Sequence, residues 1–162
     1  MRLGEGVEWG LHCATVLGLL PPDASIPAGR LAEFHGIPAA YLAKILQSLS
    51  AAGITEAVPG RRGGYRLARP AADITLLDVV LAVDGEEPAF RCTEIRRRGP
   101  AAVPARQYSP TCAIAGAMWQ AEEAFRASLR STTIADLLRQ LAGTVPPEAA
   151  VKAAAWFQEA LS

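Results

Sequence analysis

The sequence lacks net charge, long apolar runs and an even set of cysteines. Its 16 basic and 16 acidic residues cancel, so the chain as a whole is not an electrostatic nucleic-acid binder, and any such role must come from local charge. The apolar run from Ala14 to Pro22 is too short and too broken to span a membrane. Three cysteines and no leader segment predict reduced thiols and a cytoplasmic location.

Signatures of catalysis are also missing. We find no nucleotide-binding glycine loop after a strand, no nucleophile–base pair and no paired carboxylates. We therefore expect a protein that is not an enzyme and has no small-molecule substrate. Because 51% of the 162 residues are hydrophobic, the chain can bury the core of one domain plus an arm.

Apolar periodicity predicts a mainly α-helical chain. Helices are expected over residues 3–20, 27–34, 38–52, 76–83 (capped by Thr75), 113–130, 133–142 (ended by Gly143) and 148–161 (packed through Val151, Ala155 and Trp156). Two short strands, 54–58 and 65–67, flank a tight turn with two arginines. A helix–turn–helix followed by such a hairpin predicts a winged helix-turn-helix domain.

Positive charge is concentrated between residues 25 and 70, where six basic side chains accompany two acidic ones. We expect helix 38–52 to enter the major groove of a double-stranded DNA operator, with Tyr41 and Lys44 near the backbone. Arg61 and Arg62 would reach phosphates or the minor groove from the wing, and Arg66 belongs to the same surface. The alternative is that these arginines are ordinary solvated residues, but the order of the elements is more specific than charge alone.

Residues 91–112 have little apolar periodicity and carry Gly99, Pro100 and Pro104 among basic residues, which is typical of a loop. Cys92 and Cys112 lie at its two ends and supply half of a four-ligand site. Glu8 and His12, one helical turn apart, can reach a common ligand. On spacing alone, plain thiols and a polar helix strip explain these residues at least as well.

The helix at 113–130 has an apolar seam with alternating spacings of three and four, which suits a partner helix. The seam consists of Ile114, Met118, Ala121, Phe125 and Leu129. Elsewhere, Cys13 is expected to be a small buried thiol. His35, at the end of the second helix, is interpreted as a cap or surface residue.

Three segments carry a family resemblance: Ile37–Leu46, the wing Gly60–Leu67 with its Gly-Gly-Tyr sequence, and Ile74–Val79. They resemble the dimeric winged-helix regulators that include IscR, NsrR and CymR, over about the first 130 residues. The resemblance implies a homodimer built on the long helix and an operator of dyad symmetry. Cluster-binding members place three cysteines before that helix, and here the middle one is absent.

The remaining donors are similar to the ligand set of RsrR, the redox-sensing [2Fe–2S] member of that family. The resemblance implies a [2Fe–2S] cluster held by Glu8, His12, Cys92 and Cys112, with the cysteines from one protomer and the other two ligands from its partner. Trp9 is then a redox-switch candidate, although simple packing is an equal alternative.

The expected organisation is a DNA-binding domain at 1–85, a cluster-binding loop at 86–112, and a dimerisation helix with C-terminal helices at 113–162. A competing hypothesis keeps the DNA-binding fold without a cluster. Its regulator would be thiol oxidation, zinc or a protein partner.

Overall fold

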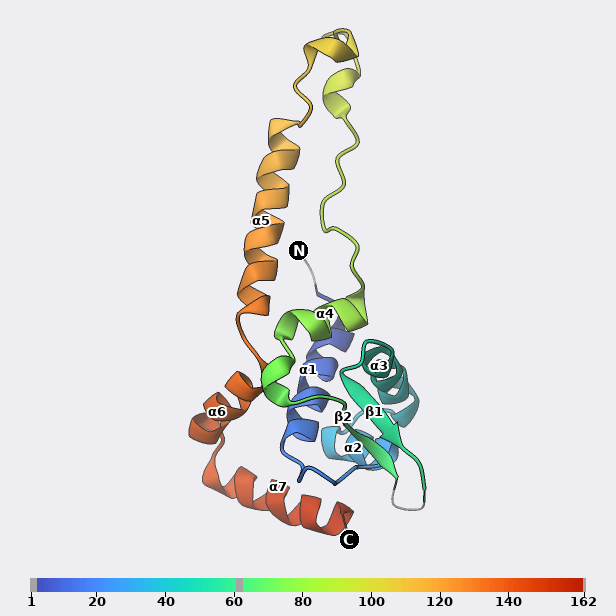
Figure 1. The fold of residues 1–162 in the computed structure, drawn as a ribbon, viewed down its shortest axis with the longest axis vertical. Helices are drawn as coiled ribbons and strands as arrows, with labels where there is room; N and C mark the ends of the chain where they lie inside the picture. The colour runs from blue at the N-terminus through green and yellow to red at the C-terminus, as the bar shows by residue number, and fades with distance from the viewer. Residues whose placement is uncertain (1–2, 61–62, 162) are drawn as a thin grey trace. The chain divides into compact units, whose positions relative to one another are not determined.

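The computed structural model describes residues 3–60 and 63–161, which are mainly helical with one two-stranded sheet (Figure 1). This confirms the predicted fold class. The helices and strands are α1 (Glu5–Gly18), α2 (Ala28–His35), α3 (Ala39–Ala51), β1 (Thr55–Val58), β2 (Gly64–Leu67), α4 (Leu76–Asp84), α5 (Ala113–Arg130), α6 (Ile134–Thr144) and α7 (Pro147–Ala160). In the described ranges, no helix is long and apolar enough to cross a lipid bilayer.

The chain divides into two compact units. The winged-helix unit contains the described residues 3–85 and 129–161, and the loop–helix unit contains residues 86–128. Each unit has its own internal contacts, so each can be understood separately.

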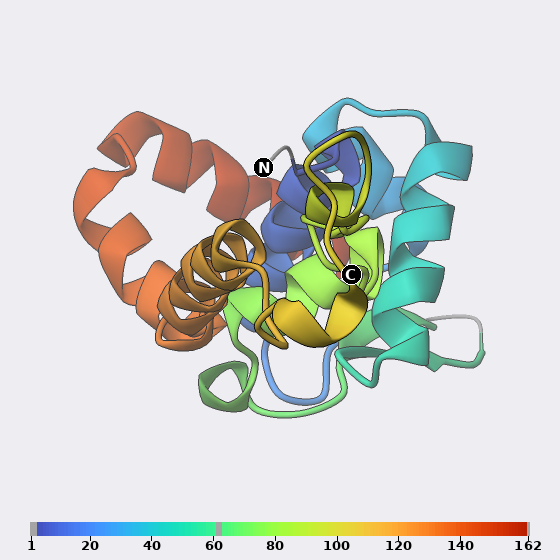
Figure 2. The same ribbon diagram turned by 90° about the horizontal axis from the view of Figure 1, so that it is seen from above.

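The core of the winged-helix unit is built around α1, which lies between α3 and α6 (Figure 2). The apolar residues of α3 repeat at three and four positions, and Leu42, Leu46 and Leu49 are fully buried. On α1, Gly10 allows α4 to approach closely, because an added Cβ would lie 3.1 Å from methyl groups of Val79 and Val83. Burial of these apolar faces supplies most of the stability of the unit.

Capping boxes begin both α4 and α6, and a backbone pairing joins the two helix starts. Thr75 accepts a hydrogen bond from the Asp78 amide, and the Asp78 carboxylate accepts one from the Thr75 amide. Thr133 begins α6 in the same way. The amide of Ile134 donates to the carbonyl of Ile74 at 2.8 Å. This backbone pairing brings the C-terminal helices into the winged-helix unit.

The hairpin is tied to the segment before α2. Its strands are antiparallel, with Glu56 opposite Arg66. Ile26 and Tyr65 exchange two backbone hydrogen bonds, of 3.0 and 2.8 Å. Only glycine fits at position 64, because a Cβ there would overlap the carbonyl group of Ile26. The Gly-Gly-Tyr sequence is therefore what lets the wing approach the helix–turn–helix.

Two expectations about the C-terminal helices are wrong. Gly143 does not end α6, which continues to Thr144. Val151 is 69% exposed and Ala155 is also exposed, so neither packs. Trp156 packs as expected, together with Phe157: their rings lie 5.0 and 4.8 Å from the ring of Phe34.

In the loop–helix unit, Glu122 and Arg126 of α5 hold the start of the loop. The Glu122 carboxylate accepts from the Ala89 amide at 3.1 Å, and Arg126 donates to both Glu122 and the Glu86 carbonyl. The loop is more ordered than its sequence predicts, because it contains two short 3-10 turns, Ile95–Arg97 and Ala105–Gln107.

Candidate functional site

Glu8 and His12 are both exposed on α1, one turn apart, as the spacing predicts. The imidazole of His12 is flanked by two rings, Trp9 at 6.2 Å and His35 at 5.9 Å between centroids. Trp9 and His35 also contact each other, at 6.0 Å. His12 therefore stands beside an aromatic group that limits the positions of its ring.

His35 is not the cap or surface residue expected from the sequence. It is half-buried, and its Nε2 is buried without a hydrogen-bond partner among the described residues. Gly36, in the left-handed conformation, forms the actual cap of α2. Burial, with a smaller contribution from His12, lowers the pKa of His35 below its ordinary value, so this ring stays neutral at pH 7.

Cys13 is the buried thiol that the sequence predicts. Its side chain has no exposed surface, and burial raises its pKa to about 12. A thiol that stays protonated at neutral pH is a poor metal ligand and a poor nucleophile. Cys13 is therefore not a candidate ligand, although it neighbours His12.

Cys92 and Cys112 are half-buried and not joined by a disulfide. Cys112 directly precedes α5, where backbone amides point toward it. Hydrogen bonds from the amides of Ala115 and Ile114, followed by the charge of Arg96, lower the pKa of Cys112 below its ordinary value. The arrangement favours the thiolate, which is the form that binds metals.

Arg96 fastens the two ends of the loop together. Its guanidinium donates to the Ser109 carbonyl at 2.8 Å and pairs with the Glu94 carboxylate at 2.9 Å. It also lies 5.2 Å from the ring of Tyr108, whose hydroxyl donates to the Arg96 carbonyl at 2.6 Å. Sequence reasoning missed this residue, because nothing distinguishes it from its arginine neighbours at 97 and 98.

The four predicted ligands form two pairs in different units. Glu8 and His12 belong to the winged-helix unit, and Cys92 and Cys112 belong to the loop–helix unit. In the part of the chain that the structure describes, no three His, Cys, Asp or Glu side chains gather in a way that could hold a metal ion. The complete ligand set therefore stays a prediction.

The exposed side of α3 carries Lys44 and Gln47, and Tyr41 is 37% exposed at its edge. Gln47 was not singled out from the sequence, although it lies three residues after Lys44 and so on the same helix side. A glutamine amide can pair with an adenine edge in the major groove. The helix thus offers one cation and one base-reading group.

In the wing, Arg61 and Arg62 lie outside the described residues. Arg66 pairs with Glu56 across the hairpin at 2.7 Å, and both side chains are partly exposed. Such surface pairs contribute only about 0–1 kcal/mol, so a phosphate could take the place of the carboxylate.

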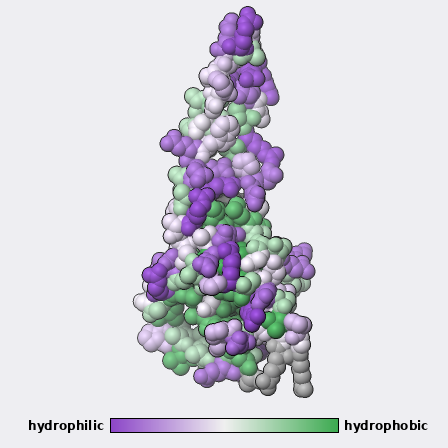
Figure 3. Space-filling view, viewed as in Figure 1, coloured by the Kyte–Doolittle hydropathy of each residue, from purple (hydrophilic) through white to green (hydrophobic). Residues whose placement is uncertain are grey.

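The predicted apolar seam of α5 is largely uncovered within the loop–helix unit. Ile114 is 69% exposed and Met118 is 43% exposed, whereas Phe125 is half-buried. In the space-filling view, hydrophilic and hydrophobic residues are mixed over the loop–helix unit (Figure 3). Exposed apolar residues at helical spacing suit a partner helix.

Comparison with known proteins agrees with the fold. In Mycobacterium tuberculosis, Rv1287, named as an HTH-type transcriptional regulator, is 32% identical over 149 residues, which cover 91% of this chain and 85% of that protein. YwgB of Bacillus subtilis, also named as an HTH-type regulator, is 36% identical over 91 residues, 56% of this chain and 58% of YwgB. The matched segment therefore spans less than two thirds of YwgB.

Two solved structures have the same fold. The cysteine regulator CymR of B. subtilis matches with a TM-score of 0.69 and 20% identity, over 86% of this chain and 98% of CymR. IscR of T. potens matches with a TM-score of 0.64 and 19% identity, over 86% of this chain and 88% of IscR. The family model of Rrf2, described as an iron-dependent transcriptional regulator, matches residues 3–140. The chain therefore belongs to the Rrf2 family of transcriptional regulators.

Proposed function

We propose that the protein is a homodimeric DNA-binding regulator that senses redox state through a [2Fe–2S] cluster. The ligands are Glu8, His12, Cys92 and Cys112. The observation that carries the proposal is the thiolate-favouring position of Cys112 at the start of α5. A regulator that only bound DNA would not need a stabilised thiolate at one end of a loop whose other end carries a second cysteine.

The donor chemistry fits the cofactor. Cysteine thiolates are the usual ligands of iron–sulfur clusters, and imidazole replaces two of them on one iron of Rieske centres. Glu8 and His12 are exposed on one side of α1, so both heads can turn to a ligand outside their own unit. The cysteine loop of one protomer would meet α1 of its partner, and the site would need both chains.

The cluster would supply a one-electron change of charge at the dimer contact. Within the chain, Trp9 and His35 pack beside the His12 ring. A movement of His12 would therefore require Trp9 to move as well. This makes Trp9 the redox-switch candidate, connecting the ligand position to the interior of the winged-helix unit.

Operator binding would use α3 and the wing. Gln47 would face the major groove, with Tyr41 and Lys44 near the backbone. Arg61, Arg62 and Arg66 would contact the backbone from the hairpin. Pairing of two α5 seams would present two such surfaces, which calls for an operator of dyad symmetry. Residues 1–85, 86–112 and 113–162 would then be the DNA-binding, cluster-binding and dimerisation parts of a cytoplasmic protein that is not an enzyme.

Iron and sulfide analysis with an anaerobic visible spectrum tests the proposal. We expect a coloured protein with about two irons per chain. Cys92→Ala and Cys112→Ala should each abolish the colour, and Cys13→Ala, the control, should keep it. A colourless protein holding zinc or no metal would contradict the cluster. It would favour the competing hypothesis of the same DNA-binding fold controlled by thiol oxidation, zinc or a protein partner.

A further inference from the structure

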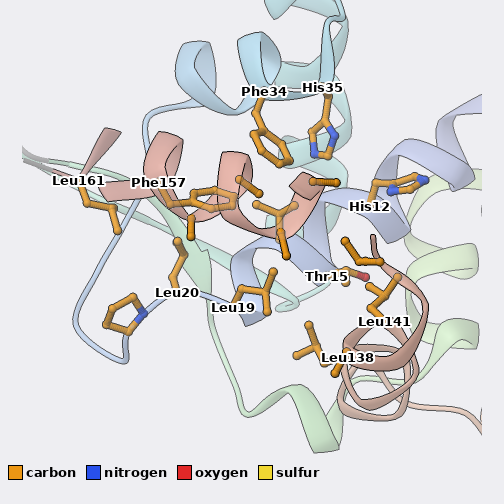
Figure 4. A pocket seen from close by; sticks show the side chains of 18 residues that line it. His12, Thr15, Leu19, Leu20, Phe34, His35, Leu138, Leu141, Phe157 and Leu161 are labelled. Atoms are coloured by element: carbon orange, nitrogen blue, oxygen red, sulfur yellow. The ribbon is translucent and has the colours of Figure 1, made fainter. Parts of the chain in front are cut away.

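An apolar groove of about 670 Å³ opens in the winged-helix unit between the ends of α1 and α2 on one side and α6 and α7 on the other (Figure 4). Its volume is within the range of small-molecule sites, about 300–1,000 Å³. All walls of the groove belong to the winged-helix unit, so the groove does not include the cysteine loop, but His12, a proposed cluster ligand, is one of its lining residues.

The walls of the groove are mostly apolar. Leucines just after α1 and on α6, with alanines of α7, form much of the lining, and Phe34 and Phe157 form an aromatic wall with their rings 4.8 Å apart. No Asp, Glu, Lys or Arg is among the described lining residues. A charged ligand would lose its hydration here without gaining an ion pair with a side chain of these four types.

Three polar side chains line the groove: His12, Thr15 and His35. The Thr15 hydroxyl donates to the Leu11 carbonyl at 2.7 Å, so its proton is already used. His35 lines the groove, and its buried Nε2 has no partner in the described part of the chain. An unpaired buried polar atom costs about 1–3 kcal/mol. A ligand hydroxyl or carbonyl could supply the missing partner after a small rotation of the ring.

The size of the groove favours a small molecule over a peptide helix. A helix about 10 Å wide with a rise of 1.5 Å per residue occupies roughly 120 Å³ per residue. The groove would therefore hold fewer than about six helical residues, less than two turns. That length buries too little of a helix to dock it, whereas a bicyclic aromatic molecule fits entirely.

We propose that this groove binds an uncharged, mostly apolar aromatic molecule with one hydroxyl or carbonyl group that hydrogen-bonds to His35. Because His12, a proposed cluster ligand, also lines the groove, the test is made on protein freed of metal, so that its result does not depend on the cluster. Aromatic walls favour aromatic ligands through offset or edge-to-face packing.

Calorimetric titration of the full-length protein with three probes tests the proposal. We expect 2-naphthol to bind, naphthalene to bind roughly tenfold more weakly, and 2-naphthoate not to bind. His35→Phe should remove the preference for 2-naphthol over naphthalene and leave naphthalene binding unchanged. Equal binding of 2-naphthol and 2-naphthoate would overturn the proposal, as would the absence of binding by 2-naphthol.

Two substitutions on α7 form a matched pair. Ala153 lines the groove, whereas Ala155 is exposed and does not. Ala153→Phe should abolish 2-naphthol binding, and Ala155→Phe should leave it unchanged. Equal effects of the two would overturn the assignment. If Ala153→Phe instead abolished self-association in ultracentrifugation, the groove would be occupied by a second copy of the chain. That outcome would also overturn the proposal of a small-molecule site.

Discussion

Gly64→Ala is predicted to detach the wing from the helix–turn–helix. A Cβ at position 64 would overlap the carbonyl group of Ile26 and lie 2.6 Å from the Pro27 nitrogen. The backbone must then move, and the two hydrogen bonds between Ile26 and Tyr65 are lost. At about 0.5–1.5 kcal/mol each, they contribute about 1–3 kcal/mol to the free energy of unfolding.

For a chain of this size, each kcal/mol corresponds to about 2–4 °C of Tm, so we expect a decrease of roughly 2–12 °C. Thermal unfolding followed by circular dichroism measures it. Gly29→Ala is the control, because an added Cβ there meets nothing within 4 Å on α2; alanine at a helical position should hold or raise Tm. A Gly64→Ala protein with unchanged Tm would refute the reasoning.

Three further predictions concern individual side chains. The amides of Ala115 and Ile114 and then the charge of Arg96 lower the pKa of Cys112, and Arg96→Gln removes that charge. Less thiolate should then be present at pH 7, so iodoacetamide should alkylate Cys112 more slowly in cluster-free protein. An equal rate would contradict the interaction between Arg96 and Cys112. Because burial raises the pKa of Cys13 to about 12, this cysteine should resist a thiol reagent at pH 8 until the protein unfolds. Peptide mapping that finds Cys13 labelled in the folded protein would be inconsistent with its burial. Lys44→Ala should weaken operator binding and reduce the salt slope by about one, as measured by fluorescence anisotropy at several salt concentrations; an unaltered slope would mean that α3 does not face the phosphates there.

Local sequence patterns predicted most of the winged-helix unit. Leu42, Leu46 and Leu49 repeat with helical spacing, and their burial follows from that spacing. Thr75 with Asp78 forms a cap whose partners are three residues apart. Patterns of this kind are visible in the sequence because the interacting residues are close along the chain.

Features that depend on distant contacts could not be predicted. In α7, abundant alanine weakens the periodicity, and the packing face is decided by Phe34 of α2, more than a hundred residues earlier. Likewise, Arg96 matters because the loop folds back to bring Ser109 within hydrogen-bonding distance. His35 is half-buried because α1 places Trp9 and His12 beside it.

One part of the candidate site could be predicted from the sequence and another part could not. The spacing of Glu8 and His12 on α1 predicted their common side correctly. The lowered pKa of Cys112 arises from the amides at the start of α5 together with Arg96. Only the first part of that environment, the helix start after residue 112, is visible in the sequence.

A mixed dimer tests the central claim most directly. One protomer would carry Cys92→Ala and Cys112→Ala, its partner would carry Glu8→Ala and His12→Ala, and two affinity tags would isolate the heterodimer under anaerobic conditions. A site shared between protomers predicts one intact ligand set, with about two irons per heterodimer against about four in the wild-type dimer. A heterodimer without iron, made from a wild-type protein that holds it, would contradict the shared four-ligand cluster.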